Sequence, residues 1–248
     1  MEFQMSMDFT LEKYRELLEA LDDCNIVTLR HDVDKKPKNS LTTAYIEREM
    51  GWTATYYFRA VPESLDPGII LQIASLGHEI GYHYESLATC KGDMEAAYKD
   101  FCNNLEQLRT LVPVKTIAMH GSPMSKWNSH DLWKHYDYHK LGIDNDSYLD
   151  TDFSRMFYLT DTGRRWDGFK VSVRDKVPEF REQWERKGWV YRSTDDIIQA
   201  IRKDRFPDDV LVNTHPQRWT DNRFQWFKEL ALQSVKNTVK RIVVSRKS

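Results

Sequence analysis

Four ionisable side chains follow an apolar run near the start of the chain: Arg30, His31, Asp32 and Asp34. Side chains alternate along a β-strand, so Arg30, Asp32 and Asp34 would share one face and His31 would lie on the other. Two carboxylates directed at one point repel each other unless a proton or a cation lies between them. This spacing favours a metal site. The alternative is an N-cap for the next helix beside a surface salt bridge.

Polar clusters with histidines follow three further apolar runs. They are His83-Tyr84-Glu85, His120-Gly121-Ser122-Pro123 and His215-Pro216-Gln217-Arg218-Trp219. If these runs are parallel strands of one β/α fold, their carboxyl ends lie on the same side of the sheet. Clustered titratable groups of this kind are typical of a functional site, so we expect the four clusters to converge.

The stretch His78-Glu-Ile-Gly-Tyr-His83 is similar to the HExxH zinc motif but has one residue too many. Two histidines five residues apart point about 140° apart on a helix and to opposite faces of a strand. They would not easily share one metal ion. We therefore interpret His78 as a packed structural histidine and His83 as the ligand candidate.

Apolar spacing predicts strands alternating with helices through the first half of the chain. A first helix over 11–21, capped by Asp8 or Thr10, precedes the strands. Alternation of this kind predicts parallel β/α units in one sheet or barrel. Residues 144–162 are less regular, with short β-like runs. The expected strands are 25–31, 53–58, 78–83, 116–119, 189–192 and 210–214, and the expected later helices are 40–50, 67–76, 93–111, 179–187, 194–202 and 223–235.

Length and composition favour one globular domain without internal repeats. At 248 residues the chain suits a single α/β core. We divide it into an N-terminal helix segment (1–24), the main domain (25–235) and a basic C-terminal tail (236–248).

The net charge and the cysteine content of the whole chain bear on its partners and its compartment. The formal net charge of −2 provides no broad basic field for nucleic acid or an anionic membrane. The three cysteines form no CxxC pair and favour a reducing compartment. No signal peptide and no apolar run of membrane-spanning length is visible, so we expect a cytoplasmic protein without membrane insertion.

The motifs and their order resemble the polysaccharide deacetylase family (NodB homology, carbohydrate esterase family 4). The resemblance rests on residues 28–34, on the Gly77–His83 stretch and on a late strand ending in His215, and it covers residues 25–220. It implies a single-domain α/β fold, a distorted (β/α)7-type barrel. It also implies a hydrolase that removes N-acetyl groups from sugars with one divalent metal ion, usually zinc.

The resemblance also implies roles for individual residues. Asp32 matches the catalytic base, His215 the catalytic acid, and Asp34 and His83 the metal ligands. The family's second ligand histidine falls on Leu87, which cannot bind a metal, so either Glu85 or His120 would have to replace it. We expect Glu85 among the metal ligands. The candidates for substrate binding are Arg30, Tyr84, His120, Trp166 and Arg218.

The favoured function is therefore a metal-dependent sugar N-deacetylase. A cytoplasmic enzyme would act on an acylated sugar, nucleotide- or lipid-linked, during synthesis of a surface polysaccharide such as the O-antigen of lipopolysaccharide. Two alternatives remain at this point. The replacement by Leu87 favours an inactive carbohydrate-binding or scaffold protein, and Asp32 with Glu85 would suit a glycoside hydrolase.

Overall fold

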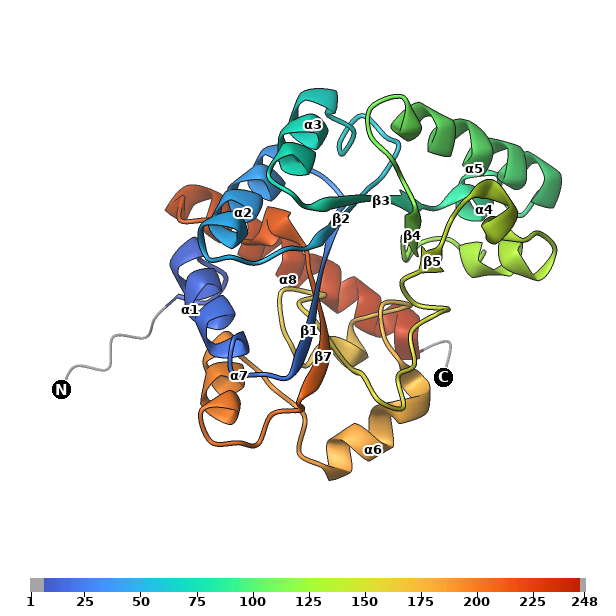
Figure 1. Ribbon diagram of the computed structural model, residues 1–248. Coiled ribbons are helices and arrows are strands. Elements are labelled where there is room, and N and C mark those ends of the chain that lie inside the picture. The colour runs from blue at the N-terminus through green and yellow to red at the C-terminus, as the bar shows by residue number, and fades with distance from the viewer. Residues whose placement is uncertain (1–6, 246–248) are drawn as a thin grey trace. The chain divides into compact units, whose positions relative to one another are not determined.

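The computed structural model describes residues 7–245, with the side chains of Lys170 and of 239–245 left out. The chain forms two compact units. The central unit is Leu29–Asp152, and the terminal unit combines Met1–Thr28 with Phe153–Ser248. Strand β1 (Ile26–Val33) begins in the terminal unit and ends in the central unit (Figure 1).

The central unit is built on parallel strands in the order β5-β4-β3-β2-β1. All residues of β1 from Leu29 onward are buried, as expected for a strand covered on both faces. The turns and helices between successive strands return the chain to the end of the sheet at which the next parallel strand begins. The strands after β1 are β2 (Thr55–Phe58), β3 (Glu79–Tyr84), β4 (Thr116–Met119) and β5 (Asn145–Asp146).

Two helices of the central unit, α3 and α5, begin at aspartates that cap them. The Asp66 side chain accepts from Ile69 N at the start of α3, and Asp93 accepts from Ala96 N at the start of α5. One face of α5 buries Ala97, Phe101, Leu105 and Leu108. The helices are α2 (Pro37–Glu49), α3 (Pro67–Ser75), α4 (Ser86–Thr89) and α5 (Met94–Arg109), with 3₁₀ turns at Ser129–Lys134 and Tyr138–Leu141.

The terminal unit contains the parallel pair β6 (Phe157–Thr160) and β7 (Asp209–Thr214). Asn25 and Ile26 N–H groups donate to Asp208 O, which joins the start of β1 to β7. Helix α1 (Leu11–Leu21) packs against α7 (Thr194–Ile201). The remaining helices are α6 (Arg181–Arg186) and α8 (Arg223–Ser245), with 3₁₀ turns at Gly168–Lys170, Pro178–Phe180 and Pro216–Arg218.

The structure confirms the α/β class. Its seven strands are all parallel, as a distorted (β/α)7-type fold requires. Thr10 caps the first helix, one of the two candidates for that role. Strand β6 lies in the segment that the sequence pattern left irregular.

The expected strand 189–192 is wrong. Its residues form no strand and pair with no other strand in the described part of the chain. The rings of Trp189 and Tyr191 instead pack edge-on against Phe157. Aromatic packing, not strand pairing, therefore accounts for the β-forming residues of this segment.

The last helix is longer than expected. It continues beyond Val235 to Ser245, because no glycine or proline interrupts this part of the sequence. Most of the predicted tail 236–248 is thus helical, whereas 246–248, like 1–6 of the N-terminal segment, lie outside the described residues. Among the residues the structure describes, no helix has both the length and the apolar character needed to cross a bilayer.

A buried carboxylate organises the face of the central sheet to which His31 points. Glu47 on α2 is fully buried and lies 2.8 Å from His31 Nε2. Tyr56 OH donates to the same carboxylate at 2.8 Å. His78 accepts from Ala54 N and donates to Ala44 O, which confirms its structural role.

We predict that Glu47→Ala lowers the free energy of unfolding by about 3 kcal/mol, because it leaves a buried imidazole and hydroxyl without their acceptor. Urea unfolding measures this loss, and the exposed Glu49→Ala on the same helix is the matched control. An equal, small effect of both substitutions would contradict a stabilising role for the Glu47 network.

Candidate functional site

Three potential metal ligands meet at the carboxyl ends of β1, β3 and β4 in the central unit. Asp34 follows β1, His83 lies near the end of β3, and His120 follows β4. One ligand atom from each lies within 4.8 Å of the others. Asp34 Oδ1 is 3.6 Å from His83 Nε2 and 3.4 Å from His120 Nε2. The sheet topology thus brings together the two expected ligands and a second histidine.

Hydrogen bonds on the far side of each ring fix the direction of both imidazoles. His83 Nδ1 is 3.0 Å from Ala118 O, and His120 Nδ1 is 2.8 Å from Glu85 Oε2. A carbonyl or a carboxylate only accepts, so each Nδ1 carries the hydrogen. Each Nε2 is then available as a donor atom for a metal ion. Histidine ligands in metal sites are oriented in this way.

The distances within the cluster fit a shared cation better than direct hydrogen bonds. An N–H···O bond ends at about 3.2 Å, which is shorter than both contacts of Asp34 with the imidazoles. Ligand atoms about 2.05 Å from a tetrahedral zinc ion would be about 3.3 Å apart. One carboxylate and two neutral imidazoles are also a common donor set for catalytic zinc. The residues present therefore fit a divalent metal ion.

Glu85, which we expected among the ligands, lies behind His120 instead. One of its oxygens accepts from His120 Nδ1, and the other is paired with Arg59. Burial alone would raise the pKa of Glu85, but His120 and Arg59 outweigh it and hold the pKa at about 2. The charged carboxylate orients His120, and His120, not Glu85, is the third residue that meets Asp34 and His83. Leu87 itself is buried in α4.

Asp32 lies next to the cluster and is held by Arg30. Its Oδ2 is 3.8 Å from His83 Nε2. Arg30 donates to both oxygens, from Nε at 2.8 Å and from Nη2 at 3.0 Å, and its Nη1 donates to Ser147. We expected Arg30 to bind substrate, but the residue is buried and its guanidinium bonds to Asp32 and Ser147. Its role in the structure is to orient Asp32.

A glycine makes room for this arrangement. The Arg30 guanidinium lies 5.2 Å from the centre of the Tyr57 ring. That ring in turn covers Gly81 so closely that a Cβ there would be 2.4 Å from it. Gly81, Tyr57 and Arg30 therefore form layers that determine the position of Asp32.

Tyr84 is fully buried, in contrast to its expected contact with substrate. Its hydroxyl donates to Asp146 Oδ2 at 2.8 Å and accepts from Trp133 Nε1 at 2.7 Å. Side chains alternate along β3, so Tyr84 points away from the face that carries His83. It supports β5 and the 3₁₀ turn that contains Trp133.

His215 in the terminal unit forms a pair with Asp161. Its Nδ1 is 2.6 Å from Asp161 Oδ1, and its backbone N–H donates to Asp161 Oδ2. Arg218 and Trp219 Nε1 donate to the same carboxylate. Burial alone would raise the pKa of Asp161, but the charges of Arg218 and His215 lower it. Asp161 therefore stays ionised and orients His215, and Arg218 supports Asp161 instead of meeting a ligand directly.

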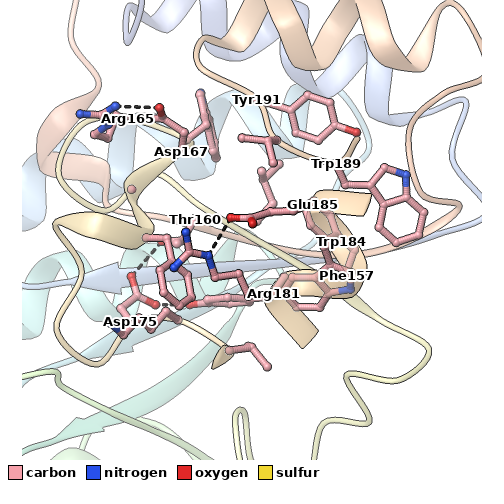
Figure 2. A pocket seen from close by; sticks show the side chains of 18 of the residues that line it. Phe157, Thr160, Arg165, Asp167, Asp175, Arg181, Trp184, Glu185, Trp189 and Tyr191 are labelled. Carbon is pink, nitrogen blue, oxygen red and sulfur yellow. Dashed lines mark hydrogen bonds and ion pairs between the residues drawn. The ribbon is translucent and has the colours of Figure 1, made fainter. Parts of the chain in front are cut away.

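A pocket of about 900 Å³ also lies within the terminal unit (Figure 2). Its apolar wall includes Phe157, Trp184 and Trp189. Two ion pairs, Arg165 with Asp167 and Arg181 with Glu185, provide polar groups along its rim. Flat aromatic faces with a few fixed polar groups are typical of small-molecule sites.

Trp166 is among the residues that line this pocket. The residue is buried, and its indole N–H donates to Thr194 Oγ1 at 2.9 Å. Its ring packs near those of Phe9 and Trp219. Its main contribution is therefore to the packing of the terminal unit. Arg165 and Trp189 are half-buried and are more accessible candidates for contact with a ligand.

Sequence reasoning missed the residues that hold the site in place. Asp161, Arg59 and Ser147 lie far from their partners in the chain and belong to no motif. For Asp161 a signal was present, since Thr160-Asp161-Thr162 ends a short β-forming run as Asp32 ends another. No comparable signal marks Arg59 or Ser147.

We predict that His120→Ala lowers affinity for zinc at least about 100-fold, because one of three protein ligands is lost. Glu85→Gln should weaken binding about 10- to 100-fold, since it removes the charge that orients His120. Competition with a chromophoric chelator measures both affinities. His135→Ala, an exposed histidine of the same unit, is the matched control. Unchanged affinity in His120→Ala would exclude His120 as a ligand.

We predict that Asp161→Asn lowers the free energy of unfolding at pH 7 by about 3 kcal/mol, because it removes the anion paired with a buried arginine. A lowered pKa means that the carboxylate contributes stability above the unfolded-state value of about 3.9 and loses it as pH falls through the folded-state value. The difference in the free energy of unfolding between Asp161→Asn and wild type should therefore become smaller below about pH 4. Unfolding measured across pH tests this, with exposed Asp204→Asn as control. A constant difference would contradict it.

No known family model and no curated protein matches the sequence. Several solved structures are similar to it at low sequence identity. A family 4 carbohydrate esterase from Streptomyces lividans is 16% identical and aligns over 86% of this chain and 91% of its own, with a TM-score of 0.43. A Streptococcus mutans CE4 esterase is 14% identical and aligns over 95% of this chain and 89% of its own, with a TM-score of 0.47. Bacillus subtilis PdaA, also a family 4 carbohydrate esterase, is 13% identical and aligns over 89% of this chain and 84% of its own, with a TM-score of 0.43.

Proposed function

We propose that this protein is a metal-dependent hydrolase that removes an N-acetyl or related acyl group from a sugar. The observation that carries the proposal is the cluster of Asp34, His83 and His120 with Asp32 beside it. The resemblance of the sequence motifs to polysaccharide deacetylases supports the choice of substrate class.

The donor set favours zinc among the divalent ions. Imidazole and carboxylate ligands suit zinc, and three protein ligands leave a further position open, as in catalytic zinc sites. An ion held there would polarise the acyl carbonyl and an attacking water molecule. The roles of the chain's own residues follow from the contacts described above.

Asp32 is the candidate general base. Its carboxylate is beside the cluster, and the two-point contact with Arg30 fixes its orientation. Amide hydrolysis requires a group that takes a proton from water, and a positioned carboxylate can do so. Asp34, by contrast, is engaged between the two imidazoles, so the two carboxylates have unequal roles.

His215 is the candidate general acid. Because Asp161 accepts from Nδ1, the other ring nitrogen can carry the proton that the departing amine requires. Arg218 has no place in proton transfer in this scheme and serves to hold Asp161.

We propose that the aromatic pocket of the terminal unit binds a sugar ring, because it includes Trp189, which is half-buried and offers a face for stacking. We also propose a cytoplasmic location, which the three free cysteines support. We therefore propose an acylated sugar precursor, nucleotide- or lipid-linked, in the synthesis of a surface polysaccharide such as O-antigen.

The site geometry disfavours both alternatives. A glycoside hydrolase using Asp32 and Glu85 needs one protonated carboxyl group at neutral pH. With a pKa of about 2, Glu85 would not hold a proton there. An inactive protein was favoured by the loss of a ligand at Leu87, but His120 completes a three-ligand cluster.

We predict that the zinc-loaded protein releases acetate from UDP-N-acetylglucosamine or from a lipid-linked N-acetylated sugar. Asp32→Asn should lower kcat about 10²- to 10⁴-fold while the metal content stays constant, because a base is lost and the ligands remain. Enzymatic detection of acetate and elemental analysis measure the two quantities.

Asp131→Asn, at a partly exposed aspartate of the central unit, is the matched control. Thermal unfolding checks that Asp32→Asn remains folded, since Arg30 loses its charged partner. Full activity of folded Asp32→Asn would exclude Asp32 as the base. No acetate from any N-acetylated sugar tested, with folded and metal-loaded protein, would contradict the deacetylase assignment.

A further inference from the structure

Helix α8 exposes its apolar side chains in the terminal unit. Phe224 is 77% exposed, Phe227 59% and Val235 66%, and Leu230 and Leu232 are also exposed. An amphipathic helix normally buries its apolar face against the core. Here the described part of α8 presents that face outward, along more than three turns.

The same helix contacts its own unit through polar groups. Glu229 and Gln233 are buried. Asn237 Nδ2 donates to Gly163 O at 2.8 Å, and Trp226 O accepts from Arg164 Nη1 at 2.8 Å. Trp226 Nε1 donates to Asp8 O at 2.7 Å. Specific hydrogen bonds therefore fix the orientation of α8, and rotating the apolar face inward would break them.

The size and continuity of the apolar face of α8 indicate an interaction surface. Scattered exposed apolar residues are ordinary, but a contiguous row of large ones marks an interaction surface. Phe224, Phe227 and Val235 lie within about 100° of one another around the helix axis at 100° per residue. They form one stripe, here named the α8 stripe, with Leu230 and Leu232 at its sides.

Charge identifies the kind of partner. Residues 223–248 contain seven basic residues and one acidic residue, a net charge of +6. The other 222 residues must then carry −8 to give the chain's −2. Three of these basic residues, Arg223, Lys228 and Lys236, are exposed on α8 in the described part of the helix. Two copies meeting along α8 would bring like charges together, whereas an anionic surface would neutralise them.

We propose that α8 binds the surface of a membrane that contains anionic lipids. The α8 stripe lies at the boundary between headgroups and acyl chains, and Arg223, Lys228 and Lys236 contact lipid phosphates. Helices with large apolar residues on one side and basic residues beside them bind membrane surfaces in this way. The helix lies on the bilayer and does not cross it. This inference is independent of the proposed catalytic function.

The test is flotation of the full chain with phosphatidylcholine vesicles, with and without phosphatidylglycerol. Wild type should float with the anionic vesicles and bind less as salt rises. Phe224→Ser combined with Phe227→Ser should weaken binding at least about tenfold. Lys228→Gln combined with Lys236→Gln should weaken it about 30-fold for anionic vesicles only.

The matched control is Tyr45→Ser combined with Leu71→Ser, which removes two exposed apolar side chains outside α8. Its binding should equal that of wild type. Thermal unfolding confirms folding of each variant. If the Phe variant unfolds, the Lys variant and the salt dependence still decide the outcome.

Three results would overturn the proposal. One is absence of wild type from the floating fraction with anionic vesicles. Another is equal binding to neutral and anionic vesicles, which would show that charge plays no part. The third is a wild-type dimer, seen by light scattering, that the Phe224→Ser and Phe227→Ser variant dissociates while vesicles have no effect, because the α8 stripe would then be a contact between two copies.

Discussion

The buried ionisable side chains of β1 constrain the central unit more than any other feature. Arg30, His31 and Asp32 are consecutive and all buried in one strand. A charge removed from water needs a partner, and alternation sends these side chains to opposite faces. On one face Arg30 pairs with Asp32, and on the other His31 meets Glu47. The strand is thus fixed on both sides by polar contacts, and the position of Asp34 at its end follows.

Local sequence patterns predicted the elements that carry the site. The predicted apolar runs that lead to the site are strands in the structure. His83 lies in one of these strands, and Asp34, His120 and His215 each directly follow one. In a parallel sheet, strand ends share an edge, so the meeting of Asp34, His83 and His120 could be foreseen in kind. The third ligand could not be chosen between Glu85 and His120, because the choice depends on which side chain Arg59 holds.

Other parts of the structure depend on contacts between residues distant in the chain. Glu47 is one charged residue among several on its helix, and its burial shows only once β1 and β3 place two histidines beside it. Asp161 likewise acquires its role from Arg218 and His215, more than fifty residues later. Trp189 and Tyr191 have β-forming side chains, yet aromatic packing with Phe157 takes the place of strand pairing. Propensity and periodicity do not contain this information.

The division of the chain into units has a consequence for biosynthesis. The central unit is one continuous segment, so all of it has been synthesised when residue 152 is added. The terminal unit combines segments from before residue 29 and after residue 152, so its N-terminal segment must wait until the later segment has been synthesised. Domains generally fold as units as they emerge from the ribosome. Folding of this protein would then start in the middle of the sequence, and α1 would pack only after α7 has been synthesised.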